Sequence, residues 1–312
     1  MNWRLGLVAG TVLLALPLTG CSFTGDEEPS TPRAAAQASA AARAKPSQPF
    51  DILQGEKVGL VEHAQAKIQF KCMADSGYPQ NQEIGVPPPI NPFEGLTIGA
   101  GSLGPMTEAE ARRTGFGIDA VAERPALVSS DSNYDKAAER CDEKAWDTLG
   151  AGARETVWAY YELTNQLGPY RKELDRKLPK DLPAKLLDCI TGEGYRAKDR
   201  NEFLKTPNPD QLGVAFGELE PATARDWEPK RRSGTVDVGP AVPARRYLPT
   251  PEESELAVAW YRCRQKTDML NAYLSAARPV QQAYVDRYES QITELNAKVE
   301  ELSRKAAALA AN

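Results

Sequence analysis

The chain has almost no histidine: His63 is the only one among 312 residues. A serine or cysteine hydrolase uses a histidine as its general base, so such a site would have to form around His63. The nucleophile motif G-x-S-x-G and the zinc-protease motif H-E-x-x-H are also missing. We therefore predict no catalytic residue, interpret His63 as an ordinary helix residue, and expect that the protein is not an enzyme.

Closely spaced metal ligands are missing too. Cys72, Cys141, Cys189 and Cys263 lie far apart and form no C-x-x-C pair. Structural zinc sites take their ligands from closely spaced pairs of cysteine and histidine residues. The sequence therefore predicts no metal site.

Neither sign of charge dominates. The 38 basic and 43 acidic residues give a formal net charge of −5. A net acidic chain repels phosphate backbones, and the one basic cluster, Lys230–Arg232 with Arg245–Arg246, lies in Pro- and Gly-rich surroundings typical of a solvated loop. We predict no nucleic-acid partner. The acidic residues allow so many pairings that no carboxylate pair stands out as a glycosidase site.

The N-terminal apolar run is too short to span a membrane. It covers residues 5–18, about 14 residues, which is the length of the apolar part of a signal peptide. The next residues, Leu18-Thr19-Gly20-Cys21, resemble the bacterial lipobox. This resemblance implies that residues 1–20 are a lipoprotein signal peptide and that Cys21 becomes an acylated, palmitate-bearing N-terminus. We expect a protein anchored by lipid on the extracytoplasmic face of the cell membrane; an ordinary cleaved signal or an uncleaved anchor are the alternatives.

Four cysteines remain once Cys21 is assigned to lipid, and an even number outside the cytoplasm predicts two disulfides. Four cysteines allow three pairings, and a repeat in the sequence favours one of them. Residues 72–78 and 189–195 both read C-x4-G-Y, each at the end of a predicted helix and with the glycine as its C-cap. Each is followed by a Pro- and Gly-rich stretch and by a second helix that carries another cysteine. We therefore pair Cys72 with Cys141 and Cys189 with Cys263; a chance match of the two signatures is the alternative.

Sustained strand patterning is scarce, so we predict a mainly α fold. Residues 21–50 contain almost no large apolar residue and are expected to form a disordered tether. Two helical units follow, each with one cysteine pair, at 51–150 and 151–312. Only short stretches such as 96–98 and 236–238 have extended character.

The strongest helical signal begins at Thr250-Pro251-Glu252-Glu253, which is typical of a capping box with proline at the first helical position. We expect this helix to continue to the C-terminus as a coiled-coil rod, bent or divided at Pro279. Its partner is either the predicted helix over 154–178, kinked at Gly168-Pro169, or the same rod of another molecule; we favour the first. The heptad seam consists of Val285, Tyr288, Ile292, Leu295, Val299, Leu302, Ala306 and Leu309.

A glycine-rich stretch, Gly99–Gly104, matches the dinucleotide motif G-x-G-x-x-G. That motif needs a helix that begins at the second glycine and a second parallel strand further on. Pro105 falls where the helix would start, and no second apolar strand follows. We therefore predict a flexible glycine loop and no cofactor.

The aromatic residues of the helical parts are expected to pack in the core, with a sugar-stacking face as the functional alternative. They are Trp146, Trp158, Tyr160, Tyr161, Trp260, Tyr261, Tyr273, Tyr284 and Tyr288.

Several of these patterns occur together in one group of proteins. The lipobox, residues 72–78, Gly115-Phe116-Gly117-Ile118, and the Thr250–Glu253 start that leads to Tyr261-Arg262-Cys263 resemble uncharacterised secreted lipoproteins of high-GC actinomycete bacteria. The resemblance covers most of residues 57–300. It implies a location but no assigned activity, and it suggests an accessory role beside export-type ABC transporters.

We therefore expect an interaction or scaffold protein with an unidentified partner protein in the cell envelope. A solute- or wall-fragment-binding lipoprotein is the alternative, and a wall-acting hydrolase is the second alternative. Partner binding predicts an exposed apolar strip on the rod, whereas ligand capture predicts a concave site lined by aromatic residues. An enzyme predicts polar side chains that converge near His63, or a buried carboxylate pair.

Overall fold

The structure is a computed structural model that describes residues 48–222 and 227–310. The signal peptide, Cys21 and all of the predicted tether up to residue 47 lie outside these ranges. The described residues all belong to one compact unit.

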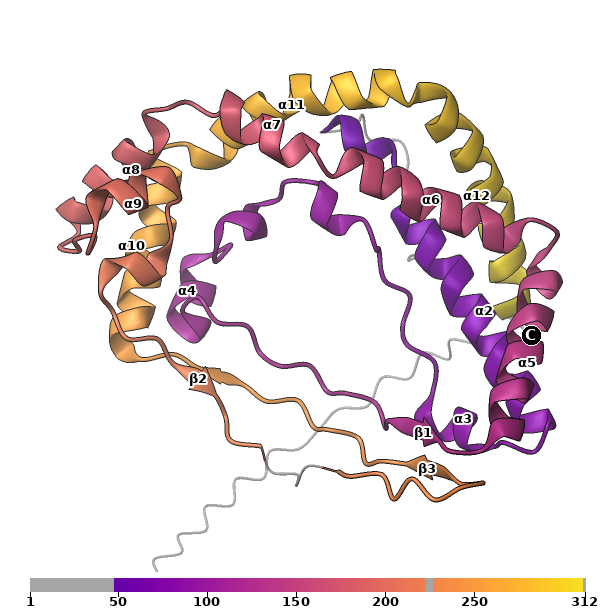
Figure 1. The fold of residues 1–312 in the computed structure, drawn as a ribbon. Coiled ribbons are helices and arrows are strands. Elements are labelled where there is room, and N and C mark those ends of the chain that lie inside the picture. The colour runs from indigo at the N-terminus through magenta and orange to yellow at the C-terminus, as the bar shows by residue number, and fades with distance from the viewer. Residues whose placement is uncertain (1–47, 223–226, 311–312) are drawn as a thin grey trace, which may run out of the picture. The chain divides into compact units, whose positions relative to one another are not determined.

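The described chain is mainly helical, as predicted (Figure 1). Its α-helices are α2 (Gly55–Asp75), α3 (Gln80–Ile84), α4 (Glu108–Thr114), α5 (Ser132–Leu149), α6 (Ala153–Leu167), α7 (Tyr170–Lys177), α8 (Leu182–Gly192), α9 (Arg200–Lys205), α10 (Pro251–Lys266), α11 (Met269–Arg287) and α12 (Glu289–Ala310). Short 3-10 helices are η1 (Pro49–Ile52), η2 (Glu94–Leu96), η3 (Ala100–Leu103) and η4 (Pro209–Leu212).

The strands form two small antiparallel pairs. β1 (Leu127–Ser129) pairs with β3 (Val236–Val238), with Leu127 opposite Val238. β2 (Glu218–Leu219) pairs with β4 (Tyr247–Leu248). The extended character expected at 236–238 is confirmed, whereas 96–98 forms no strand because Leu96 ends η2.

The larger core lies between α2, α6, α11 and α12. α2 buries Val58, Val61 and Ala64 together, since apolar residues three or four positions apart lie on one face of a helix. The segment before α2 joins this core as well. Phe50 is 1% exposed, so the folded body includes the last residues that we assigned to the tether.

The heptad seam of α12 packs inside the chain. α12 lies along α2 and α6, with Ile292, Leu295 and Val299 buried between them (Figure 1). Burying the seam removes apolar surface from water without a second molecule. The favoured intramolecular partner is confirmed, although α2 shares the role with α6.

The helix predicted from Thr250 onward is three helices, and none of the divisions falls at Pro279, where we expected a bend or a division. The divisions fall at Asp268, which has a left-handed backbone (φ 51°), and at Tyr288. Pro279 lies inside α11 and is exposed, where water can satisfy the carbonyl group that loses its partner. By contrast, Gly168-Pro169 divides α6 from α7 as expected.

Both disulfides have the expected pairing. Cys72–Cys141 joins α2 to α5, and Cys189–Cys263 joins α8 to α10. The second bridge lies beside a smaller core built from α8, α9 and α10. The two predicted units do not form separate bodies, because α12 lies along α2 and α10 lies along α4.

The repeated C-x4-G-Y signature is a helix terminator in both copies. Gly77 (φ 96°) and Gly194 (φ 97°) adopt the left-handed backbone that glycine reaches without a steric penalty. The amide of the following residue donates to the carbonyl five residues earlier, from Tyr78 to Met73 (2.9 Å) and from Tyr195 to Ile190 (3.2 Å). This is the Schellman arrangement, so the predicted C-caps are confirmed.

Candidate functional site

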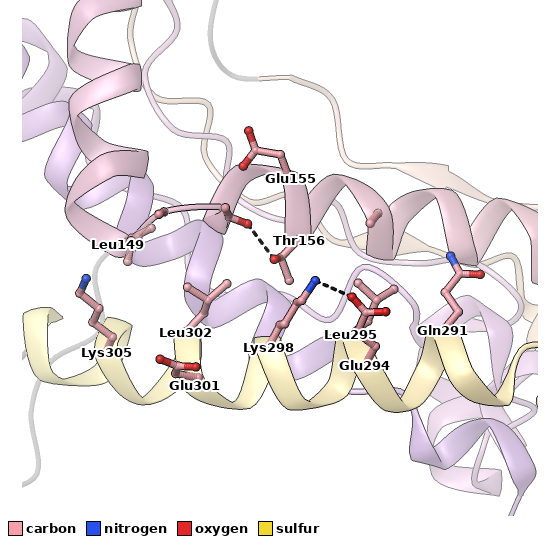
Figure 2. Close-up of a pocket in the computed structure, with 14 residues that line it drawn as sticks. Leu149, Glu155, Thr156, Gln291, Glu294, Leu295, Lys298, Glu301, Leu302 and Lys305 are labelled. Atoms are coloured by element: carbon pink, nitrogen blue, oxygen red, sulfur yellow. Dashed lines mark hydrogen bonds and ion pairs between the residues drawn. The ribbon is translucent and has the colours of Figure 1, made fainter.

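An open groove of about 570 Å³ runs between α6 and α12 (Figure 2). The two helices run in opposite directions, because Tyr160 bonds to Asn296 whereas Gly150, before α6, lies near Lys305 at the far end of α12. The residues that line the groove are Leu149, Gly150, Ala151, Gly152, Glu155, Thr156, Ala159, Gln291, Glu294, Leu295, Lys298, Glu301, Leu302 and Lys305.

The groove stays open because its residues near α6 are small. Gly150 (φ 133°) and Gly152 (φ 76°) turn the chain from α5 into α6 with left-handed backbones. Thr156 folds back so that its Oγ1 donates to the Gly152 carbonyl (2.7 Å), shown by a dashed line in Figure 2. Ala159 is the next groove residue of α6, one turn on, and its methyl group leaves room above Leu295 of α12.

Charged side chains of both signs stand along the groove. The Lys298 ammonium donates to Glu294 (2.6 Å), and this bond holds the pKa of the Glu294 carboxyl below its usual value. Among the described residues, Glu155, Glu301 and Lys305 form no ion pair. The groove therefore offers unpaired charges of both signs above an apolar floor of Leu149, Leu295 and Leu302.

Buried hydrogen bonds fix the two helices behind the groove. The Tyr160 hydroxyl donates to Asn296 Oδ1 (2.6 Å) and accepts from the Gln54 amide (2.7 Å). Asn296 Nδ2 in turn donates to the Ile52 carbonyl (3.0 Å). Burial raises the pKa of Tyr160 to about 12, so this hydroxyl keeps its proton at neutral pH. The spacing of α6 and α12 is thus set by specific contacts as well as by packing.

Trp158 is exposed, contrary to the core position that we expected for it. It is 64% exposed on α6, three residues after Glu155. The buried stripe of α6 consists of Val157, Tyr160, Leu163 and Leu167, and residue 158 falls on another face of the helix. The exposed apolar strip that partner binding predicts for the rod is not found in the described part of α12, because α2 and α6 cover its seam except where Leu302 lines the groove.

A second, aromatic cavity of about 350 Å³ lies near α10. Phe116, Phe216, Trp260 and Tyr273 contribute rings to its lining. Phe116 meets Trp260 edge-on, with ring centroids 5.8 Å apart, and the Trp260 indole donates to the Leu103 carbonyl (3.1 Å). This cavity is the concave aromatic site that ligand capture predicts.

The glycine-rich stretch forms η3 and is held in place. Arg264 donates to the carbonyls of Ala100 (3.0 Å) and Pro105, and Trp260 holds the Leu103 carbonyl. No parallel strand precedes or follows it in the described ranges, so it lacks the strand and helix that a dinucleotide site requires. The expectation of a flexible loop is corrected: three side-chain hydrogen bonds tie this loop to α10.

Glu253, which we expected to complete a capping box, is a fully buried carboxylate. It accepts hydrogen bonds from the amides of Phe116 (2.8 Å) and Gly217 (2.7 Å) and from the Tyr247 hydroxyl (3.1 Å). The capping box is therefore only half formed. Thr250 Oγ1 accepts from the Glu253 amide (3.0 Å), but the Glu253 side chain turns to the loops instead of to Thr250.

Glu253 brings together two of the motifs on which the family resemblance depends. Gly115 (φ 57°) lies so close that a Cβ there would be 2.4 Å from Glu253 Oε1. Burial raises the pKa of Tyr247 to about 12, and the nearby carboxylate adds to the shift. The two amides and the Tyr247 hydroxyl that donate to Glu253 all belong to the fold itself, so we infer that Glu253 holds these loops in position. The proximity of residues 115–118 to 250–253 could not be read from the sequence.

His63 bonds to backbone and not to a nucleophile. Its Nδ1 donates to the Pro87 carbonyl (2.6 Å). The neighbouring Glu62 accepts from the Tyr161 hydroxyl (3.0 and 3.1 Å), and burial raises the pKa of the Glu62 carboxyl. Tyr161 has a pKa of about 12, raised first by burial and then by Glu62. These groups join α2 to α6 and to the proline-rich loop.

Among the described residues, no helix has the length and apolarity needed to cross a membrane, and no group of side chains is arranged to hold a metal ion. No family model, curated protein or solved structure matches this chain.

Proposed function

We propose that this protein is a lipid-anchored extracytoplasmic interaction protein that binds one helix of an envelope protein in the groove between α6 and α12. The groove itself carries the proposal: it is open, has an apolar floor, and lies between two antiparallel helices. A third helix packs well in such a position, with its apolar side chains three or four residues apart on the floor. The resemblance to exporter-associated lipoproteins suggests that the partner belongs to a transporter complex.

The chemistry of the groove supports a protein helix as the occupant. Glycine and alanine at 150–152 and 159 allow a backbone to approach closely, and the unpaired Glu155, Glu301 and Lys305 can meet charges of either sign on a partner. Trp158, exposed on α6 three residues after Glu155, is the kind of side chain that dominates the energy of protein interfaces.

A photo-crosslinking amino acid at position 301 tests this proposal in intact cells of the native host. We expect one discrete adduct with an envelope protein from position 301, and none from position 307, which is exposed and does not line the groove. Ala159→Arg, which fills the groove, should abolish the adduct. The matched control Asn165→Arg, which makes the same charge change at an exposed residue of α6 outside the groove, should leave it unchanged. The same adducts from 301 and 307, or an adduct that survives Ala159→Arg, would refute binding in the groove.

Anchoring needs a separate test, because Cys21 lies outside the described residues. Cell fractionation of a Cys21→Ala variant should move the protein from the membrane to the soluble extracytoplasmic fraction. A variant that stays in the membrane fraction would refute lipid attachment through Cys21 and would leave the groove proposal intact.

A further inference from the structure

The aromatic cavity adjoins a larger cavity of about 660 Å³. Pro207, Met269 and Tyr273 line both, so the two cavities meet at the start of α11. Leu178, Leu182 and Leu204 of the second cavity continue the apolar lining. We call the two together the α11 cleft. Ligand pockets commonly combine an apolar lining of this kind with a few charged groups at one end.

The charged groups of the α11 cleft are unevenly placed. Arg176 and Lys180 line the second cavity, and the side chain of neither forms a hydrogen bond or an ion pair with the described residues. Lys205 is already paired with Glu202 (2.7 Å). The aromatic cavity contains no basic residue; its one charged lining residue is Asp210. An anionic group is therefore attracted to the second cavity and repelled from the aromatic one.

Asp175 is the acidic group of the second cavity, and Tyr273 lines both this cavity and the aromatic one. Burial and the Asp175 charge raise the pKa of Tyr273, so this phenol remains a hydrogen-bond donor. Its hydroxyl has no partner among the described residues. Arg176 and Lys180 outnumber the single carboxylate Asp175, so this end of the cleft has a net positive charge. The Tyr273 hydroxyl adds a hydrogen-bond donor.

Sugar hydroxyl groups would find few free partners in the aromatic cavity. Asn208 Oδ1 accepts from the Asp210 amide (3.1 Å), and Ser102 Oγ accepts from the Gly99 amide (3.2 Å). Trp260 is only 4% exposed, so its ring face is not open for stacking. The aromatic cavity suits an apolar chain better than a sugar.

We propose that the α11 cleft binds a single-chain anionic amphiphile, with its hydrocarbon chain in the aromatic cavity and its headgroup beside Arg176 and Lys180. A free fatty acid and the acyl part of a membrane lipid share this chemistry. The inference does not depend on the groove between α6 and α12. Each methylene group that enters the cleft contributes about 0.8 kcal/mol, so affinity should rise about fourfold for each added methylene until the cleft is full.

Calorimetric titration tests the proposal with the full chain carrying Cys21→Ser, which removes the acylation site and the need for detergent. Saturated fatty acids of increasing length, used below micelle-forming concentrations, should bind one to one with the stepwise rise given above. Dodecanoate with a terminal bromine should also quench tryptophan fluorescence, because Trp260 lies in the cavity. The double variant Arg176→Glu, Lys180→Glu should weaken dodecanoate binding at least tenfold and leave dodecanol binding unchanged.

The matched control Lys298→Glu, Lys305→Glu makes the same charge change at the groove between α6 and α12. It should change neither the affinity for dodecanoate nor the affinity for dodecanol. Phosphatidylglycerol vesicles distinguish the source of the ligand: competition with dodecanoate indicates that a membrane lipid enters the same cleft, and absence of competition indicates a free fatty acid. The proposal is overturned if binding is not saturable, does not depend on chain length, or is equally tight for dodecyltrimethylammonium.

Discussion

Replacing Glu253 by alanine should destabilise the protein strongly, because this carboxylate satisfies two backbone amides that have no other acceptor close by. The substitution leaves the amides of Phe116 and Gly217 without their partner and also removes the bond from the Tyr247 hydroxyl. An unsatisfied buried amide costs about 1–3 kcal/mol, so two of them lower the free energy of unfolding by about 2–6 kcal/mol. Urea denaturation, with the slope m unchanged, measures the difference.

The neighbouring residue provides the control. Glu252 is exposed in the same first turn of α10, and Glu252→Ala loses only its interaction with the helix dipole, about 0.3–1 kcal/mol. Glu253→Gln keeps the size of the side chain but points an amide N–H at one of the donors, so it should cost about 1–3 kcal/mol. If Glu253→Ala is as stable as Glu252→Ala, Glu253 does not hold the loops as we describe.

Three further outcomes can be measured. Tyr160→Phe removes the hydrogen bonds to Asn296 and Gln54 and should lower the free energy of unfolding by about 1–3 kcal/mol, measured by urea denaturation. The control Tyr261→Phe loses no hydrogen bond that the structure shows and should change the free energy of unfolding little. Replacing both Cys72 and Cys141 by alanine should cost about 2–4 kcal/mol in thermal unfolding, and an unchanged midpoint would contradict a bridge between α2 and α5. Folding raises the pKa values of Tyr160, Tyr161 and Tyr247 from 10.0 to about 12, so the folded protein holds these phenol protons more tightly than the unfolded chain. The stability that this adds is complete below pH 10 and is lost as the pH rises to about 12. Ultraviolet titration of the phenols and unfolding measured at each pH will follow this loss.

Features set by neighbouring residues could be predicted from the sequence. The two Schellman caps depend on a glycine that can adopt positive φ and on the residues within one turn of it, so Gly77 and Gly194 were found from local pattern alone. The seam of α12 was found in the same way, because its spacing of three and four residues requires a partner whatever the fold. Both disulfides followed from the repeat that contains these caps.

Features set by contacts between distant segments could not be predicted. Pro279 carries a strong local signal for a break, yet the helix continues through it because that face is in water, and the chain divides instead at Asp268 and Tyr288. The sequence Gly99–Gly104 matches the dinucleotide motif, but that motif binds a nucleotide only when it follows a strand of a parallel sheet, and the described residues form no parallel sheet.

The groove between α6 and α12 shows why the candidate site in particular could not be seen in the sequence. A heptad seam predicts that α12 is covered, and α2 and α6 do cover Ile292 and Val299. It does not predict how far along α12 that cover extends, and Leu302 lies in an open groove instead of under another helix. The signal that could have located the groove is the small residues at 150–152 and 159, which a covered interface would have filled with larger side chains. A cluster of small residues beside an otherwise complete heptad seam is therefore the pattern that predicts room for a further helix.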